Sequence, residues 1–211
     1  MIAGALAVGT IGSFVAIVLA NDNSQQDLAR RDKLTAEYQA EYQAYQAKVN
    51  AQDADVASRT AELSAKYYNE FNAYNSRVST FDPANITELK TEDLKVGEGA
   101  EISSSSTFIA YYIGWKSDGT IFDQSISDGA LKTPIAASPG SVITGWTEGA
   151  VGMKVGGIRE LTIPSNKAYG PTGSGDSIPG NTPLKFIIMI IETREAIAAP
   201  QPSEELLRFY Q

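Results

Sequence analysis

The sequence contains no cysteine and no histidine among its 211 residues. Thiolate nucleophiles, disulfides, Cys/His zinc sites and catalytic triads with an imidazole base are therefore excluded. Basic residues are also scarce, with 17 Lys and Arg against 25 Asp and Glu and a net charge of −8. Because phosphate backbones are bound by clustered Lys and Arg, we expect no nucleic-acid partner. We also expect no metal ion and no cofactor.

One long hydrophobic run stands near the start of the chain. Residues 2–20 contain no charged side chain, and about 20 apolar residues cross a bilayer as a helix. We therefore predict a transmembrane anchor over residues 1–21. A cleaved secretory signal is the alternative, because Val18 and Ala20 are small residues of the kind that precede a cleavage site. The anchor is favoured, since the run exceeds a usual signal core and no Lys or Arg precedes it.

The orientation of this predicted anchor is open at the level of sequence. Arg30, Arg31 and Lys33 follow the hydrophobic run, and the positive-inside rule would place them in the cytoplasm. The acidic residues among them weaken that rule little. We nevertheless expect an extracytoplasmic body in a bacterial-type cell envelope, either anchored to the membrane or secreted after cleavage.

Residues 22–82 are predicted to form a helical, coiled-coil-like spacer. Residues 24–81 lack Pro and Gly and are rich in Ala, Gln, Tyr and Glu, as helices are. The polar residues 50–55 mark either a break between two helices or a weak stretch of one. Self-association through the spacer is open, because tyrosine hydroxyls fit a tight two-stranded coil poorly. Larger apolar side chains recur mostly at the three- and four-residue spacing of an amphipathic helix: Leu34, Tyr38, Tyr42, Tyr45, Val49, Val56, Leu63, Tyr67, Phe71, Tyr74 and Val78.

A β-rich domain is predicted over residues 83–195, followed by a flexible tail over residues 196–211. Beyond Pro83, β-branched and aromatic residues are separated by turns of Gly, Asp and Pro. Residues 141–153 carry apolar side chains at helical spacing, with Ser141 as a candidate N-cap. The predicted fold class is therefore α+β, in which an antiparallel β-sheet has this one short helix as the only candidate cover within the domain. Strands are expected at residues 89–95, 107–115, 158–163 and 184–193.

Six sequence blocks follow one another in this domain. In chain order they read YIG at 112–114, DGTIFD at 118–123, VITGWTEG at 142–149, MKVGGIRELTIP at 153–164, AYG at 168–170 and IPGNTPLKF at 178–186. Together they resemble the FK506-binding (FKBP-type) peptidyl-prolyl cis-trans isomerase family. The match is specific because several blocks occur in the right order, and it covers about half of the chain. The predicted anchor, spacer and tail lie outside it.

The resemblance implies an FKBP-like fold, in which an antiparallel sheet wraps around one short helix and an aromatic pocket binds proline. In that pocket Trp146 would form the floor and Asp123 would be the one buried acid. The backbone N–H of Ile143 and the hydroxyl of Tyr169 would hold carbonyl groups of the ligand. Ile135 departs from the aromatic residue that is frequent at its position in the family. The catalytic residues implied are Tyr112, Phe122, Asp123, Trp146, Tyr169 and Phe186. The substrate-binding residues implied are Ile135, Val142, Ile143 and Ile178.

The activity implied by the resemblance is rotation about X-Pro peptide bonds in folding proteins. The implied partners are proline-containing polypeptides and macrolide inhibitors of the FK506 class. Rotation needs no nucleophile and no proton transfer, so it is compatible with a chain that lacks Cys and His. Together with the predicted anchor, this gives a membrane-tethered isomerase. Two alternatives remain: a non-catalytic chaperone module that binds proline segments on a helical stalk, and a structural protein whose Tyr-rich helix pairs with another chain.

Overall fold

The computed structural model describes residues 25–210, which fall into two compact units. One unit spans residues 53–196, and the other combines residues up to 52 with those from 197 onward. The predicted anchor at residues 1–21 lies outside the described residues. Within the part of the chain that is described, no helix is both long and apolar enough to cross a membrane.

The region predicted as a spacer is mainly helical. Helix α1 continues through the polar residues 50–55, so no break occurs there. The chain leaves helical geometry instead at Arg59, whose φ of −94° and ψ of 3° separate α1 from the next helix. The elements are α1 (Gln25–Ser58), α2 (Thr60–Ala73) and the short 3-10 helix η1 (Tyr74–Arg77).

The larger unit is built on an antiparallel sheet. Its strands are β1 (Lys90–Lys95), β2 (Thr107–Trp115), β3 (Ile121–Gln124), β6 (Ile135–Ala137), β7 (Ile158–Ile163) and β8 (Leu184–Arg194). Their order is β1-β7-β8-β2-β3, with β6 also paired to β2. Two further strands, β4 (Ile126–Ser127) and β5 (Ala130–Leu131), form a separate hairpin. The four strands predicted from the sequence are confirmed. Strands β3 to β6 are not predicted, because two to four residues are too few to show an alternating pattern.

Helix α3 (Thr144–Ala150) packs against one face of this sheet. Gly145 allows the close approach, because a Cβ atom there would collide with the side chain of Ile163 in β7. The predicted short helix is therefore confirmed, but it is shorter than expected and Ser141 is not its N-cap. The Ser141 hydroxyl instead accepts a hydrogen bond from the backbone N–H of Ser138, in the turn that precedes the helix.

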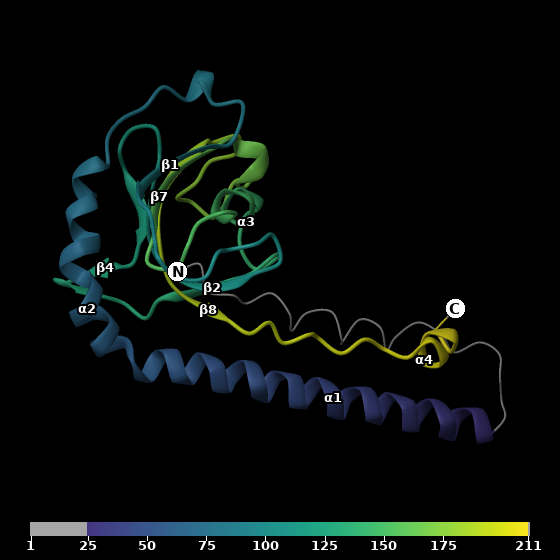
Figure 1. The fold of residues 1–211 in the computed structure, drawn as a ribbon. Coiled ribbons are helices and arrows are strands. Elements are labelled where there is room, and N and C mark those ends of the chain that lie inside the picture. The colour runs from purple at the N-terminus through teal and green to yellow at the C-terminus, as the bar shows by residue number, and fades with distance from the viewer. Residues whose placement is uncertain (1–24, 211) are drawn as a thin grey trace. The chain divides into compact units, whose positions relative to one another are not determined.

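Helix α2 covers the opposite face of the sheet (Figure 1). On that face Tyr111, Ile113 and Met189 are buried and share one apolar cluster with Leu63 and Phe71 of α2. The sheet therefore has a second cover, which lies outside the residues 83–195 predicted as the domain. Strands β2 and β8 are nearly continuous apolar runs, which is the pattern of a sheet covered on both faces. The second half of the predicted spacer thus belongs to the larger unit, which begins at residue 53.

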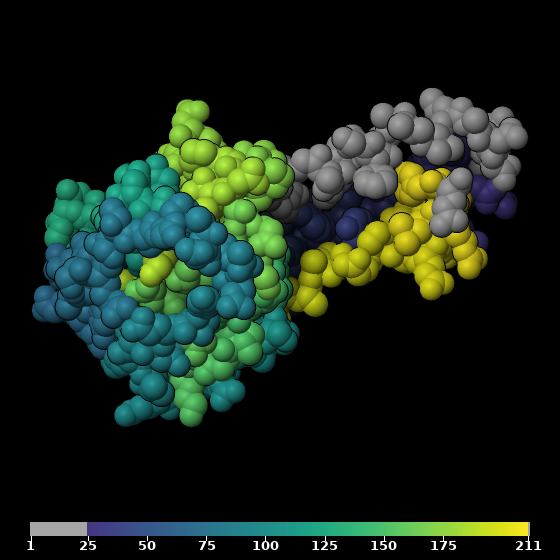
Figure 2. Space-filling model, turned by 90° about the horizontal axis from the view of Figure 1, so that it is seen from above, coloured from purple at the N-terminus to yellow at the C-terminus, as the bar shows by residue number. Residues whose placement is uncertain are grey.

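The connection from α2 to β1 passes over one end of the sheet and includes the 3-10 helix η2 (Pro83–Asn85). Arg77 pairs with Glu160 at 2.9 Å, and Lys185 pairs with the second oxygen of that carboxylate at 2.7 Å. The indole N–H of Trp115 donates to the carbonyl oxygen of Ser79 at 3.1 Å. From above, the blue and teal atoms of this part of the chain surround a hollow (Figure 2). The connection is therefore bonded to the sheet at several points.

The smaller unit contains the short helix α4 (Glu204–Arg208). The hydroxyl of Ser203 caps this helix by accepting a hydrogen bond from the backbone N–H of Leu206 at 3.1 Å. Leu206 is buried, and Arg30 of α1 forms an ion pair with Glu205. The predicted tail thus contains a helical turn that is joined to α1.

Candidate active site

Four aromatic rings from four elements meet on the α3 face of the sheet. Tyr112 comes from β2, Phe122 from β3, Trp146 from α3 and Phe186 from β8. The centroid of the Trp146 ring lies 5.5 Å from that of Tyr112 and 5.4 Å from that of Phe186. The rings of Phe122 and Phe186 are 5.5 Å apart. All three pairs are edge-to-face, which the opposite partial charges of ring edges and ring faces favour. The rings therefore form one ordered apolar cluster.

Gly114 leaves the space in which two of these rings meet. In β2 it lies opposite Asp123 of β3 and Phe186 of β8. A Cβ atom at Gly114 would lie 2.6 Å from the ring of Phe186 and 2.7 Å from the ring of Phe122. Any side chain at this position would therefore push the two rings apart. Close packing explains the glycine of the YIG block.

Asp123 is fixed beside the rings by two hydrogen bonds. The Tyr112 hydroxyl donates to Oδ2 at 2.6 Å, and the backbone N–H of Gln124 donates to Oδ1 at 2.8 Å. The pKa of Tyr112 is raised well above its usual range, mainly by burial and next by the hydrogen bond to Asp123. The hydroxyl therefore stays a donor at neutral pH. Asp123 is half-buried, which differs from the expectation. The acid that is buried among the described residues is Glu160, whose carboxylate forms ion pairs with Arg77 and Lys185 on the opposite face.

Ser125 supports the same site, and the sequence alone does not reveal it. The residue is buried, and its backbone N–H donates to the carbonyl oxygen of Tyr112 at 2.8 Å. Its hydroxyl accepts a hydrogen bond from the backbone N–H of Tyr112 at 2.9 Å. Both backbone groups of Tyr112 are thus tied to one serine. A serine shortly after an acid has no distinctive pattern, so only the fold shows this role.

Tyr169 lies in the loop after the 3-10 helix η3 (Ser165–Lys167) and packs against the aromatic cluster. Burial raises the pKa of its hydroxyl, and the negative charge of Asp123 raises it further. The hydroxyl is therefore protonated and able to donate at neutral pH. Lys167 forms an ion pair with Glu148 of α3, so the start of this loop is joined to the helix that carries Trp146.

The residues predicted to bind substrate lie around the same cluster. Ile178 is buried, whereas Ile135, Val142 and Ile143 are partly exposed at the edge of the cluster. Ile143 is the N-cap residue of α3, so its backbone N–H lies outside the helix's internal hydrogen bonds. The structure thus brings all ten predicted residues together, nine in or against the apolar cluster and Asp123 bonded to one of them. Their action on a substrate stays a prediction at this point.

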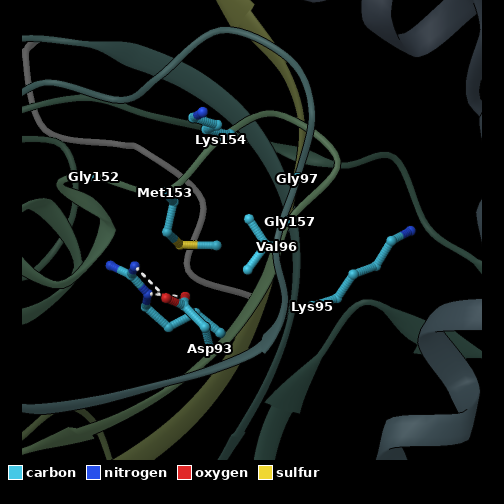
Figure 3. A pocket seen from close by; sticks show the side chains of 9 residues that line it. Asp93, Lys95, Val96, Gly97, Gly152, Met153, Lys154 and Gly157 are labelled. Atoms are coloured by element: carbon cyan, nitrogen blue, oxygen red, sulfur yellow. Dashed lines mark hydrogen bonds and ion pairs between the residues drawn. The ribbon is translucent and has the colours of Figure 1, made fainter.

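A small pocket lies apart from the aromatic cluster, near the end of β1 (Figure 3). Its volume of about 20 Å³ leaves room for about one water molecule. Arg159 on its wall binds both carboxylate oxygens of Asp93 at 2.6 and 3.0 Å. The same guanidinium donates to the carbonyl oxygens of Gly149 and Val151 at the end of α3. The pocket's guanidinium and carboxylate are therefore paired, and they join β1 to the helix. Across residues 25–210, no group of three or more acidic side chains is placed to hold a metal ion.

Comparison with known proteins shows what the larger unit is similar to. A family model described as FKBP-type peptidyl-prolyl cis-trans isomerase matches residues 98–191. An FK506-binding protein of Neisseria meningitidis serogroup A is 41% identical over 104 residues, which are 49% of this chain and 94% of that protein. A probable FK506-binding protein of Corynebacterium glutamicum is 43% identical over 106 residues, 49% of this chain and 86% of that protein. A crystal structure of a peptidyl-prolyl cis-trans isomerase from Pseudomonas syringae pv. tomato is 28% identical with a TM-score of 0.46, and the match covers 62% of this chain and 96% of that chain.

Proposed function

The chain belongs to the FKBP-type peptidyl-prolyl cis-trans isomerase family, and from this premise we propose that the aromatic cluster on the α3 face is its isomerase site. The chain is therefore an enzyme that interconverts the cis and trans forms of peptide bonds that precede proline. One observation carries the placement of the site. The rings of Tyr112, Trp146 and Phe186 meet edge to face, beside a hydrogen-bonded carboxylate, within residues 98–191, which the family model matches.

The barrier to this reaction is the partial double bond of the peptide linkage. Rotation costs about 18–20 kcal/mol because resonance stiffens the C–N bond, and free X-Pro bonds exchange in roughly 10–100 s. Water stabilises the charge-separated planar form, so transfer of the bond to an apolar site lined by rings favours the twisted form by comparison. A thousandfold acceleration requires only about 4 kcal/mol. Because no proton is transferred, a chain without His or Cys can catalyse this reaction.

The polar groups of the site orient the substrate. The Tyr169 hydroxyl donates to a carbonyl oxygen next to the rotating bond, because a hydrogen bond to the rotating carbonyl itself would stabilise the planar form. The backbone N–H of Ile143 holds a second carbonyl oxygen. Asp123 accepts hydrogen bonds from Tyr112 and Gln124, so it holds the wall of the site and is not a general base.

The substrates are proline-containing segments of folding polypeptides. Four side chains around the aromatic cluster contact the segment on either side of the proline: Ile135, Val142 and Ile143 at its edge, and the buried Ile178. The relatives from Neisseria and Corynebacterium are named for FK506 binding. We therefore expect macrolides of the FK506 class to bind against the same aromatic rings in this chain and to compete with the peptide.

The test is an isomerisation assay with the full-length chain and a short X-Pro peptide. The cis-to-trans rate should rise in proportion to protein concentration and fall when an FK506-class macrolide is added. Peptide binding at an uncatalysed rate would support the alternative function, a chaperone module that only holds proline segments. The absence of both binding and catalysis would refute both functions.

We propose further that residues 1–21 tether this enzyme to a membrane, with its body on the extracytoplasmic side of a bacterial-type cell envelope. The support is the uncharged run at residues 2–20, whose length fits a bilayer. A tethered protein should remain in the membrane pellet after an alkaline wash and be digested by protease added outside the cytoplasmic membrane. A released protein whose first residue follows Ala20 would show a cleaved signal instead. A protein found only in the soluble cytoplasmic fraction would refute the tether.

A further inference from the structure

The chain between β3 and β6 makes an excursion away from the main sheet. It forms the β4–β5 hairpin, whose turn consists of Asp128 and Gly129 with φ of 51° and 76°. Each strand of this hairpin has only two residues. An isolated two-stranded hairpin is marginally stable at best in water. Contacts from outside the hairpin must therefore hold it in place.

Helix α2 supplies those contacts. The hydroxyl of Ser64 accepts a hydrogen bond from the backbone N–H of Leu131 at 2.8 Å, and both residues are buried. The hydroxyls of Thr60 and Thr133 form a second hydrogen bond at 2.9 Å. Leu131 also lies in the same apolar cluster as Leu63 of α2. Figure 1 shows the hairpin strand β4 beside this helix. The second half of the hairpin is thus bonded to a helix that lies far from it in the sequence.

The two ends of the hairpin are held in different ways. The first end is fixed by Ser125, whose backbone and side chain both bond to Tyr112 without any help from α2. The second end leaves Leu131, is joined to the first by a hydrogen bond from the Lys132 N–H to the Ser125 carbonyl oxygen, and reaches Ile135 through the buried Pro134. Ile135 is the first residue of β6, where it pairs with Ala110 of β2 and contacts the aromatic cluster. A shift of Leu131 relative to α2 therefore acts on Ile135 at the start of its strand, whereas the two bonds from Ser125 hold Tyr112.

We infer that α2 is a positioning element of the isomerase site, because Ser64 holds Leu131 and thereby sets the course of the segment that enters β6 at Ile135, at the edge of the aromatic cluster. The inference rests on the proposed function, which assigns Ile135 to substrate binding. It extends the working site beyond residues 98–191, which the family model matches. Ile135 contacts the bound segment before and during rotation alike, so its displacement weakens binding without changing the rotation itself. The effect should therefore appear in KM and not in kcat.

Three serine substitutions in the full-length chain test this inference. Ser64→Ala removes the acceptor of the Leu131 N–H, and it should raise KM for an X-Pro peptide about three- to tenfold while kcat stays within a factor of about two. Ser64→Thr keeps a hydroxyl and should restore KM. Ser58→Ala is the matched control, because its hydroxyl bonds only to the carbonyl oxygen of Asp55 within α1. All assays use a temperature at which circular dichroism shows each variant to be folded.

A double-mutant cycle separates positioning from a general loss of stability. If Ser64 acts through Ile135, then Ser64→Ala should not raise KM further in an Ile135→Ala background. If Ser64→Ala fails to fold, Thr60→Val takes its place, because it removes only the exposed hydrogen bond to Thr133. An unchanged KM in the folded variant, or an equal rise in both backgrounds, would overturn the inference.

The failure of the proposed function is distinguishable from the failure of this inference. A wild-type chain that does not catalyse X-Pro rotation refutes the function. The positioning is then read from the NMR signals of the Ile135 methyl groups and the Leu131 amide. Ser64→Ala should shift both signals and speed hydrogen exchange of the amide, while the Tyr112 amide stays protected. Unshifted Ile135 methyl signals would overturn the positioning, whatever the activity.

Discussion

The two faces of the central sheet are both apolar, but they differ in what accompanies the apolar side chains. On the α3 face, rings such as Phe122 and Tyr169 are partly exposed, and the Tyr112 hydroxyl is bonded to Asp123. On the α2 face, Phe71 and Trp115 are fully buried. The first face suits ligand binding, and the second suits stability. Burial alone therefore does not mark a site, whereas partial exposure beside fixed polar groups does.

Removal of residues 1–82 should produce the largest effect, because it uncovers the α2 face of the sheet. It exposes Tyr111, Ile113 and Met189, which α2 and the following connection help to bury. Burial of each such side chain contributes about 1.5–3 kcal/mol, and a domain has only about 5–15 kcal/mol in total. The shortened chain should therefore not fold, as measured by circular dichroism and urea unfolding.

The control for this deletion is a chain that begins at Asp53, the first residue of the larger unit. This chain retains α2 and should fold and catalyse the reaction. A stable, cooperatively folded chain without residues 1–82 would show that α2 is dispensable to the sheet and would contradict the division between the two faces.

Phe71→Ala should lower stability and spare activity. Phe71 is fully buried on α2, and truncation of a buried Phe costs about 3–5 kcal/mol in the free energy of unfolding. Urea unfolding should show this loss, while kcat/KM of the folded fraction stays within a factor of about two. Phe71→Leu, which keeps most of the volume, should cost less. A tenfold fall in kcat of the folded Phe71→Ala protein would contradict the assignment of the α2 face to stability.

The sequence predicts the long elements of this fold well and their partners poorly. Residues 107–115 and 158–163 are recognisable as strands because apolar and β-branched residues are bounded there by turns, and the structure gives the same bounds. An amphipathic stripe such as that of α2 shows that a helix has an apolar face, but it does not show what covers that face. From the sequence alone, this stripe therefore predicts a spacer.

The candidate site is predictable only through the order of several motifs. Each ring taken singly, such as Phe122 or Phe186, reads as ordinary core. The six blocks together identify the family and bring the ten candidate residues to one place. The bond between Ser64 and Leu131 joins residues 67 positions apart and has no local pattern. Contacts of this kind require the folded chain.

Tyr169→Phe should give the reverse of the Phe71 result. It removes one hydroxyl that we assign to substrate orientation, and the loss of a hydrogen bond worth about 1.4 kcal/mol lowers kcat/KM about tenfold. The free energy of unfolding should change by less than about 0.5 kcal/mol. Peptide kinetics and urea unfolding measure the two quantities. Tyr74→Phe is the matched control on the other face and should change neither. Full activity of Tyr169→Phe would remove the assigned role.

The smallest effect concerns Tyr111, which is buried on the α2 face and whose hydroxyl has no hydrogen-bond partner among the described residues. Burial raises its pKa to about 12. The folded chain therefore keeps a proton that the unfolded chain loses above about pH 10, so stability falls as the pH rises from about 10 to 12.

Tyr111→Phe should make this decline less steep and leave stability at pH 7 nearly unchanged. The decline does not vanish, because the pKa values of Tyr112 and Tyr169 are raised in the same direction. Urea unfolding at pH 7, 10 and 11 gives the slope. An unaltered slope would show that Tyr111 does not keep its proton in the folded state.

The chain's two tryptophans lie on opposite faces, and this allows the central claim to be tested in one titration. Trp146 belongs to the proposed site. Trp115 belongs to the apolar cluster on the α2 face, and its indole N–H donates to the carbonyl oxygen of Ser79. Their indole N–H signals are followed by NMR while an X-Pro peptide is added to the full-length chain. We predict that the Trp146 signal shifts, the Trp115 signal stays, and exchange peaks link the cis and trans forms of the peptide. A shift of Trp115 alone, or an unshifted Trp146 without exchange peaks, would contradict the account.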